Sequence, residues 1–201
     1  MRNTNLLTPT QQLSIANNTI LATGKYLLSE SAPKGFESTK PLFAALASVI
    51  GPGNPGDSRR LALVVVRTAS RRSAELARPH MALLAPPVFA SVRDPVIPVK
   101  LAAEAAFVEL FGVADEESRV FDKYLAGPAA SELPANTRRS MQDYFRRVAL
   151  RLGSQVRERR EAEGGAGGAG ALGLANDEVE DEKEIWSVGG VETGGGVFAQ
   201  E

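Results

Sequence analysis

Apolar residues recur every three or four positions in four stretches of the chain, residues 9–29, 39–50, 79–92 and 96–111. This spacing gathers the apolar side chains on one face of a helix, so each stretch predicts an amphipathic helix. Thr8-Pro9 is typical of a helix start, because proline at the first helical position gives up no needed N–H group.

The stretch 96–111 has the clearest pattern. Lys100, Glu104 and Glu109 point away from an apolar face, which consists of Val99, Ala102, Ala103, Ala106, Phe107 and Leu110. We expect Phe107 to be a core residue. In the stretch 39–50, Pro41 is expected to open the helix.

Residues 61–66 form an apolar, β-branched run that fits either a buried strand or a helix. Asp57 and Ser58 before it are good N-caps, and no second run of this kind is available to pair with it as a strand. The sequence therefore favours a helix here.

Gly51–Gly56 is expected to be a loop and Arg93-Asp94-Pro95 a tight turn. A shorter helix is predicted at about 115–125, and a long helix begins at Pro134 or Asn136 and ends near Glu163. Helices joined by short loops in succession predict stacked helical hairpins. The fold class is therefore all-α, a HEAT/armadillo-like α-solenoid fragment.

The predicted organisation has a disordered start at residues 1–8, HEAT-like repeats at 9–126 and a capping helix at 127–163. Residues 164–201, rich in Gly, Ala and acids, are predicted to be a disordered tail, because they cannot bury enough apolar surface. The tail holds the only Trp, in the motif Glu184-Ile185-Trp186. This motif is either an anchor for a partner groove or a segment that folds back on the last helix or has no role.

Charge is unevenly distributed, although the net charge is only −1. Residues 137–160 carry eight Arg against two acids, whereas 161–201 carry ten acids against one Lys. This pattern indicates either a polyanionic partner for the basic surface or an ordinary solvated face. The candidate ribosome or partner surface is Arg59, Arg60, Arg67, Arg71, Arg72, Arg146, Arg147 and Arg151.

No cysteine is present and His80 is the only histidine, so thiolate metal sites and multi-histidine metal sites are excluded. A surface or helix-capping role is expected for His80. No Walker loop or nucleophile elbow occurs, so the chain is predicted not to be an enzyme and to need no cofactor. No apolar run is long enough to cross a bilayer and no signal peptide is recognisable, which predicts a cytoplasmic protein.

Gly51, Gly53 and Gly56 match the spacing of a dinucleotide-binding loop, with Glu75 about twenty residues later. That motif requires a preceding strand, but the residues before Gly51 have helical spacing. Two prolines also occupy the loop. The pattern is interpreted as a coincidence.

Residues 84–111 resemble a single HEAT unit, with Pro86-Pro87 bending a first helix and Asp94 able to cap the second. With YFRRVALRLGSQVRERREAEGG at 144–165 and NDEVEDEKEIWSVGGVE at 176–192, the chain resembles the C-terminal end of the giant HEAT-repeat activators of general amino-acid control. The resemblance covers about residues 9–192.

The resemblance implies a translational-control scaffold that acts on ribosomes and stimulates the kinase for the alpha subunit of translation initiation factor two. It also implies an ATP-binding-cassette partner and binding of the kinase through its RWD domain, with no small-molecule substrate and no membrane. The family's kinase contact lies mostly upstream of the region resembled, so no residue here is assigned to it. The alternative is a generic HEAT adaptor, such as a fragment of a transport receptor or phosphatase scaffold.

The chain departs from the family by starting at Met1 and by running past the family's end from Glu192 onward. The chain is therefore interpreted as a truncated gene model, a remnant or an independent protein. With no earlier helix to cover the first one, apolar side chains of that helix are expected to face water, drawn from Leu13, Ile20, Leu21, Leu27 and Leu28.

Overall fold

The computed structural model describes residues 8–29, 35–72, 74–112 and 119–163, with side chains described up to residue 152 in the last helix. Every regular element within these ranges is helical. The elements are α1 (Pro9–Leu28), α2 (Phe36–Ile50), α3 (Gly56–Arg72), α4 (Ala74–Ala77), the 3-10 turn η1 (Arg78–His80), α5 (Met81–Ser91), α6 (Ile97–Phe111), α7 (Val120–Ala126), α8 (Pro128–Ser131) and α9 (Ala135–Glu163).

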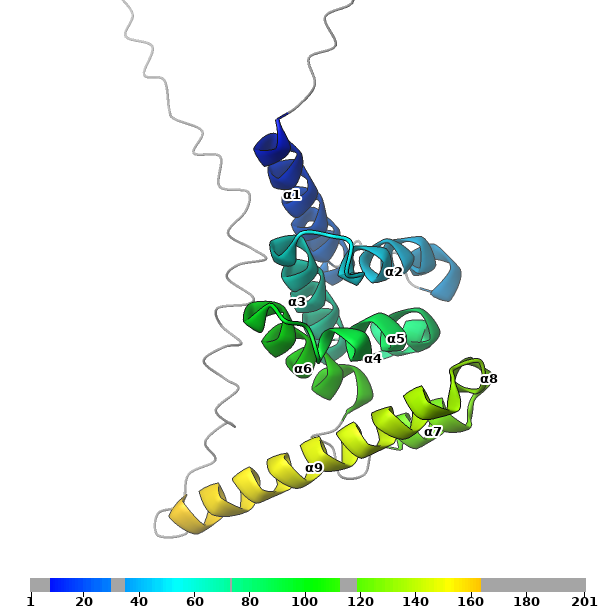
Figure 1. Ribbon diagram of the computed structural model, residues 1–201, viewed down its shortest axis with the longest axis vertical. Coiled ribbons are helices and arrows are strands. Elements are labelled where there is room, and N and C mark those ends of the chain that lie inside the picture. The colour runs from blue at the N-terminus through cyan, green and yellow to red at the C-terminus, as the bar shows by residue number, and fades with distance from the viewer. Residues whose placement is uncertain (1–7, 30–34, 73, 113–118, 164–201) are drawn as a thin grey trace, which may run out of the picture.

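The helices form two layers. In one layer α3 packs between α1 and α6, and in the other α2 packs against α5 (Figure 1). Within each hairpin the two helices also contact each other: α2 contacts α3, and α5 contacts α6. The described part of the chain therefore has the all-α, HEAT-like arrangement that the sequence predicts.

α3 is the centre of the molecule. Apart from Arg60, every residue from Ser58 to Ser70 is buried, including the whole run 61–66. A helix that is apolar on all sides needs neighbours on all sides, and α1, α2 and α6 supply them. The ambiguous run is thus a helix, as predicted.

The start of α1 is confirmed. Thr8 and Gln11 form a reciprocal capping box, in which Thr8 Oγ1 accepts from the Gln11 N–H and Gln11 Oε1 accepts from the Thr8 N–H at 2.9 Å. The predicted opening of the next helix at Pro41 is wrong, because α2 begins at Phe36 and Pro41 lies inside it. Phe36 packs its ring on His80, and this contact helps hold the additional first turn despite the hydrogen bond lost at Pro41.

The expectation of an exposed apolar face on α1 is wrong for three of its five residues. Ile20, Leu21 and Leu27 are buried, because α1 packs along α3 and touches α2. Leu13 and Leu28 are partly buried. The large apolar side chains that α1 does expose are Ile15, at 51%, and Tyr26.

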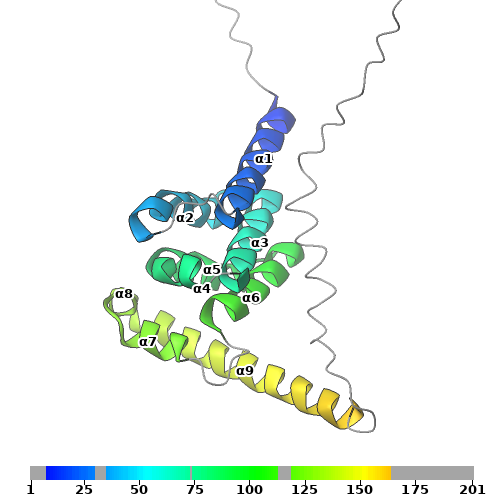
Figure 2. The ribbon, with the colours of Figure 1, turned by 180° about the vertical axis from the view of Figure 1, so that it is seen from behind.

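α9 crosses the end of the stack, with α7 and α8 beside its first half (Figures 1 and 2). Its Tyr144 ring meets Phe89 of α5 and Phe107 of α6, and its Phe145 ring stacks on Phe121 of α7 at 4.0 Å between centroids. α6 ends at Gly112, whose φ of 62° is the left-handed conformation that glycine adopts most easily. The predicted helix at 115–125 begins later, at Val120, and residues 113–118 lie outside the described ranges.

Candidate interaction surface

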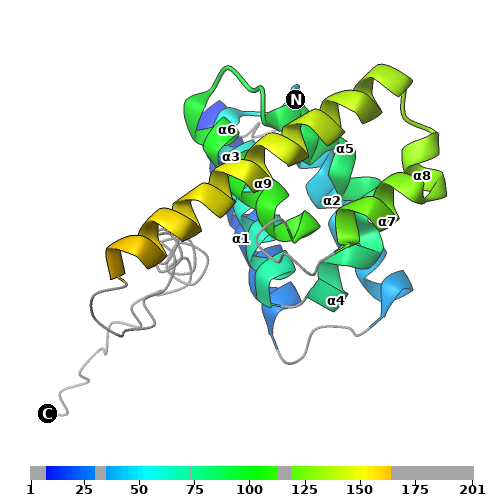
Figure 3. The same cartoon turned by 90° about the horizontal axis from the view of Figure 1, so that it is seen from below.

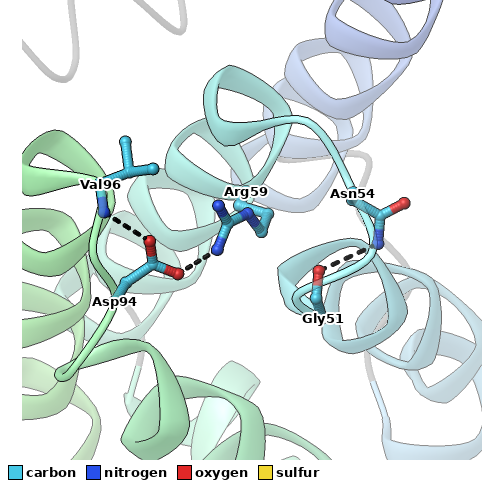
Figure 4. Close-up of polar contacts among 5 residues, drawn as sticks. All are labelled: Gly51, Asn54, Arg59, Asp94 and Val96. Carbon is cyan, nitrogen blue, oxygen red and sulfur yellow. Dashed lines mark hydrogen bonds and ion pairs between the residues drawn. The ribbon is translucent and has the colours of Figure 1, made fainter.

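The buried Arg59 links the hairpin α2–α3 to the hairpin α5–α6. Its guanidinium forms an ion pair with Asp94, which lies in the turn between α5 and α6 (Figure 4). The other carboxylate oxygen of Asp94 accepts a hydrogen bond from the N–H of Val96 at 2.9 Å, the residue that precedes α6. Asp94 therefore fixes the turn, as predicted, and also holds α3 to it.

This pairing changes the predicted basic surface. Arg59 is only 7% exposed and Arg67 is buried to the same degree. A buried guanidinium, which for Arg59 is also paired with a carboxylate, offers little to an external polyanion. We therefore leave Arg59 and Arg67 out of the candidate surface.

The remaining predicted arginines occupy two separate helices. Arg71 and Arg72 are exposed at the end of α3, and Arg60 near its start is partly buried. Arg146, Arg147 and Arg151 are exposed on α9. α6 lies between α3 and α9 (Figures 1 and 2). The arginines that were predicted to form one basic surface therefore lie on two separate helices.

The α9 arginines are held by local contacts. The Arg147 guanidinium lies 5.9 Å from the centre of the Tyr144 ring, and its Nε–H donates to the Asp143 carbonyl. Arg151 lies 3.8 Å from the Glu104 carboxylate of α6. Burial and the nearby Glu104 carboxylate raise the pKa of Tyr144 to about 12, so this phenol is neutral at physiological pH. The predicted tail motif Glu184, Ile185 and Trp186 lies outside the described residues.

The expectation that His80 is a surface or capping residue is wrong. His80 is 1% exposed, and its imidazole lies between the rings of Phe36 and Phe43, each 4.7 Å away between centroids. Its Nε2 lies 2.7 Å from Thr39 Oγ1. Thr39 Oγ1 also lies 3.0 Å from the Gly35 carbonyl, to which it can donate. His80 is thus part of the contact between α2 and η1.

The environment of His80 favours its neutral form. Burial lowers the pKa of His80, the positive charge of Lys40 lowers it further, and Glu37 acts in the opposite direction. Nδ1 is buried without a hydrogen-bond partner, so a second proton there would have no acceptor. Sequence reasoning missed this burial because the partners lie about forty residues earlier in the chain.

An apolar groove with a volume of about 550 Å³ runs beside α1. Leu13 and Ala16 of α1 line one side, and Val49 and Pro55 line the other. Ser58, which also lines the groove, donates through Oγ to Asn17 Oδ1 at 2.6 Å and so joins α3 to α1. The groove carries few polar groups, so it suits an apolar helix face better than a charged ligand.

Within the described ranges, no cluster of three or more metal-ligating side chains occurs, and no helix combines the length and apolar character needed to span a bilayer. The glycine-rich segment Gly51–Gly56 connects helices α2 and α3, with Asn54 Nδ2 donating to the Gly51 carbonyl (Figure 4). Because the element before these glycines is a helix, the dinucleotide-loop interpretation is rejected on structural grounds as well.

The layered hairpins, the fixed Asp94 turn and the apolar end groove define a HEAT-like α-solenoid segment. The chain is similar in sequence to the eIF-2-alpha kinase activator GCN1 of Saccharomyces cerevisiae, with 37% identity over 200 residues. The match covers 87% of this chain and 7% of that protein, so the chain spans a small part of its relative's length. The chain is thus related to a segment of GCN1. No known protein-family profile and no solved structure matches it.

Proposed function

We propose that this chain is a non-catalytic scaffold segment, from the C-terminal end, of an activator of the kinase that phosphorylates eIF-2-alpha in amino-acid starvation. The observation that carries the proposal is the 37% identity to GCN1 along 87% of the chain, since that relative is by name an activator of this kinase. The packed helical core supports a scaffold role, because stacked helices offer surfaces along their length.

We further propose that the working partner of the basic surface is the ribosome in the cytoplasm. Arg147 and Arg151 stand four residues apart and therefore share one side of α9, and the exposed Arg146 directly precedes Arg147. Exposed guanidinium groups suit the phosphates of RNA. The kinase, through its RWD domain, and an ATP-binding-cassette protein are proposed partners through the same resemblance.

A generic HEAT adaptor from nuclear transport or a phosphatase complex would share the layered hairpins. The comparison does not favour this alternative, because the similarity found is to GCN1, an activator of the eIF-2-alpha kinase. Ribosome binding is the property that separates the two functions.

Co-sedimentation of the full chain with purified ribosomes tests the proposal. We expect binding that weakens steeply as salt rises, because each phosphate contact releases counterions. The variant Arg146→Glu should lower binding at every salt concentration, whereas the matched control Lys123→Glu, an equal charge change at an exposed site on α7, should leave it unchanged. Absence of ribosome binding, or equal losses in the two variants, would argue against the proposal.

A further inference from the structure

One face of α6 is apolar where the fold leaves it open to solvent. Ile97 is 68% exposed and Leu101, one turn later, is 58% exposed; Val96, just before the helix, is also exposed. We call Val96, Ile97 and Leu101 the α6 stripe. The next residue along the same face is Glu104, which pairs with Arg151 of α9. α9 crosses α6 (Figure 3), and the Arg151–Glu104 pair joins the two helices one turn beyond the stripe, whose side chains stay exposed.

Positive side chains surround the stripe. Lys100 is exposed beside Leu101 and Arg93 is exposed in the turn before α6. At the far end Arg151 of α9 lies 3.8 Å from Glu104, and 55% of its side chain stays exposed. The nearest acid in the turn, Asp94, is already paired with Arg59. An apolar strip bordered by cations fits a segment that combines apolar side chains with acids.

The chain itself carries such a segment. Residues 176–188 contain six acids and one Lys, and the apolar Ile185, Trp186 and Val188 stand at the end of the acidic run. We propose that this segment docks on the α6 stripe of the same chain, with Ile185 and Trp186 against Ile97 and Leu101, and with the acids facing Lys100, Arg93 and Arg151.

The length of chain between the two parts allows this contact. α9 passes α6 at Arg151 and ends at Glu163, which carries the backbone about 18 Å beyond the crossing. Residues 164–175 then provide twelve positions, rich in Gly and Ala, before the docking segment of residues 176–188. A Gly-rich chain of that length has a root-mean-square span of about 17–21 Å, which matches the distance that the end of α9 carries it beyond the crossing, so the segment reaches the stripe.

Docking also accounts for the composition of the acidic segment and of the linker before it. A Trp side chain removes about 150–250 Å² of surface from water when it is buried, which favours a single aromatic anchor in an otherwise polar segment. The linker confines the motif near its target, so weak contacts between apolar groups and between charges suffice to hold it. This inference is independent of the proposed function, because it concerns contacts within one chain.

The fluorescence of Trp186 tests the proposal directly, since it is the only Trp in the protein. In the full chain at low concentration, Trp186 emission should be shifted to the blue, and acrylamide should quench it severalfold less than in a synthetic peptide of residues 176–192. The double variant Ile97→Ser, Leu101→Ser should restore peptide-like emission and quenching. Both side chains are largely exposed, so circular dichroism should show an unchanged fold.

The matched control is Ile15→Ser, which removes a comparably exposed apolar side chain from α1 and should leave Trp186 shielded. Raising the salt concentration should increase quenching, since the acids contribute to docking. Peptide-like quenching in the unmodified chain would overturn the proposal. Shielding that survives the double variant would also overturn it, and shielding that grows with protein concentration would replace it with contact between copies.

Discussion

Tyr144 of α9 stands edge-on to Phe107 of α6, with ring centroids 5.0 Å apart and ring planes at 85°. Phe107 also contacts Phe89, Phe111 and Phe121, so it lies at the centre of an aromatic cluster that joins α5, α6, α7 and α9. The last helix is thereby attached to the stacked hairpins through aromatic contacts, which prefer this tilted geometry.

Replacing Phe107 by Ala should lower the free energy of unfolding by about 3–5 kcal/mol, because the side chain is fully buried and leaves a cavity. Urea denaturation followed by circular dichroism measures the change. Phe36→Ala provides a contrast, since that ring is partly exposed, and should cost clearly less. Equal losses in the two variants would mean that Phe107 does not occupy the core.

Replacing Asp94 by Ala should destabilise the fold by about 3–5 kcal/mol, because it leaves the buried Arg59 without its partner. Replacing both residues together, as Arg59→Met with Asp94→Leu, should recover a large part of that loss, since no uncompensated charge then remains. The comparison is a thermal or urea melt of the single and double variants. A double variant as unstable as Asp94→Ala would show that the charge pair is not the cause.

Acid should destabilise the protein through His80. Its pKa is lowered in the folded state, so its contribution is complete above the unfolded pKa of about 6.5 and is lost as pH falls below that value. Melts between pH 7.5 and about 5.5 should show this decline. His80→Phe keeps a ring between Phe36 and Phe43 and should remove this pH dependence, because the chain has no other histidine. A decline of the same size in the variant would assign it to other groups.

Removing residues 164–201 should tighten binding to ribosomes or to another polyanion. This stretch holds eight acids and one Lys, which compete with the external polyanion for the arginines of α9. The effect should be largest at low salt, where charges are least screened. Co-sedimentation of the full and shortened chains gives the measurement, and unchanged binding would indicate that the arginines form an ordinary solvated face.

The periodic helices could be predicted from the sequence because their signal is local. Of the predicted apolar face of α6, Ala102 is partly buried and the other members are buried, namely Val99, Ala103, Ala106, Phe107 and Leu110. The same reasoning placed the loop after Ile50 and the turn at Asp94, because Gly and Pro act on their immediate neighbours. Local signals of this kind need no knowledge of the packing.

The buried polar residues could not be predicted in this way. Arg59 stands beside Arg60 in a basic run, which is typical of a surface residue. In the fold it is paired with Asp94, 35 positions later in the sequence. His80 depends on Thr39, 41 positions earlier. Such contacts are set by the stacking of one hairpin on the next, so a single sequence without the fold carries no sign of them.

Phosphorylation of eIF-2-alpha in starved yeast tests most directly whether this chain serves as a segment of a kinase activator. Cells lacking GCN1 would express yeast GCN1 with this chain in place of the segment it aligns with, GCN1 with that segment deleted, or this chain alone. We expect phosphorylation with the exchanged segment and none with the other two, because the deletion lacks the proposed ribosome-binding surface and the chain alone is too short to bridge ribosome and kinase. An exchanged protein that accumulates normally but fails like the deletion, or a chain that activates alone, would contradict it.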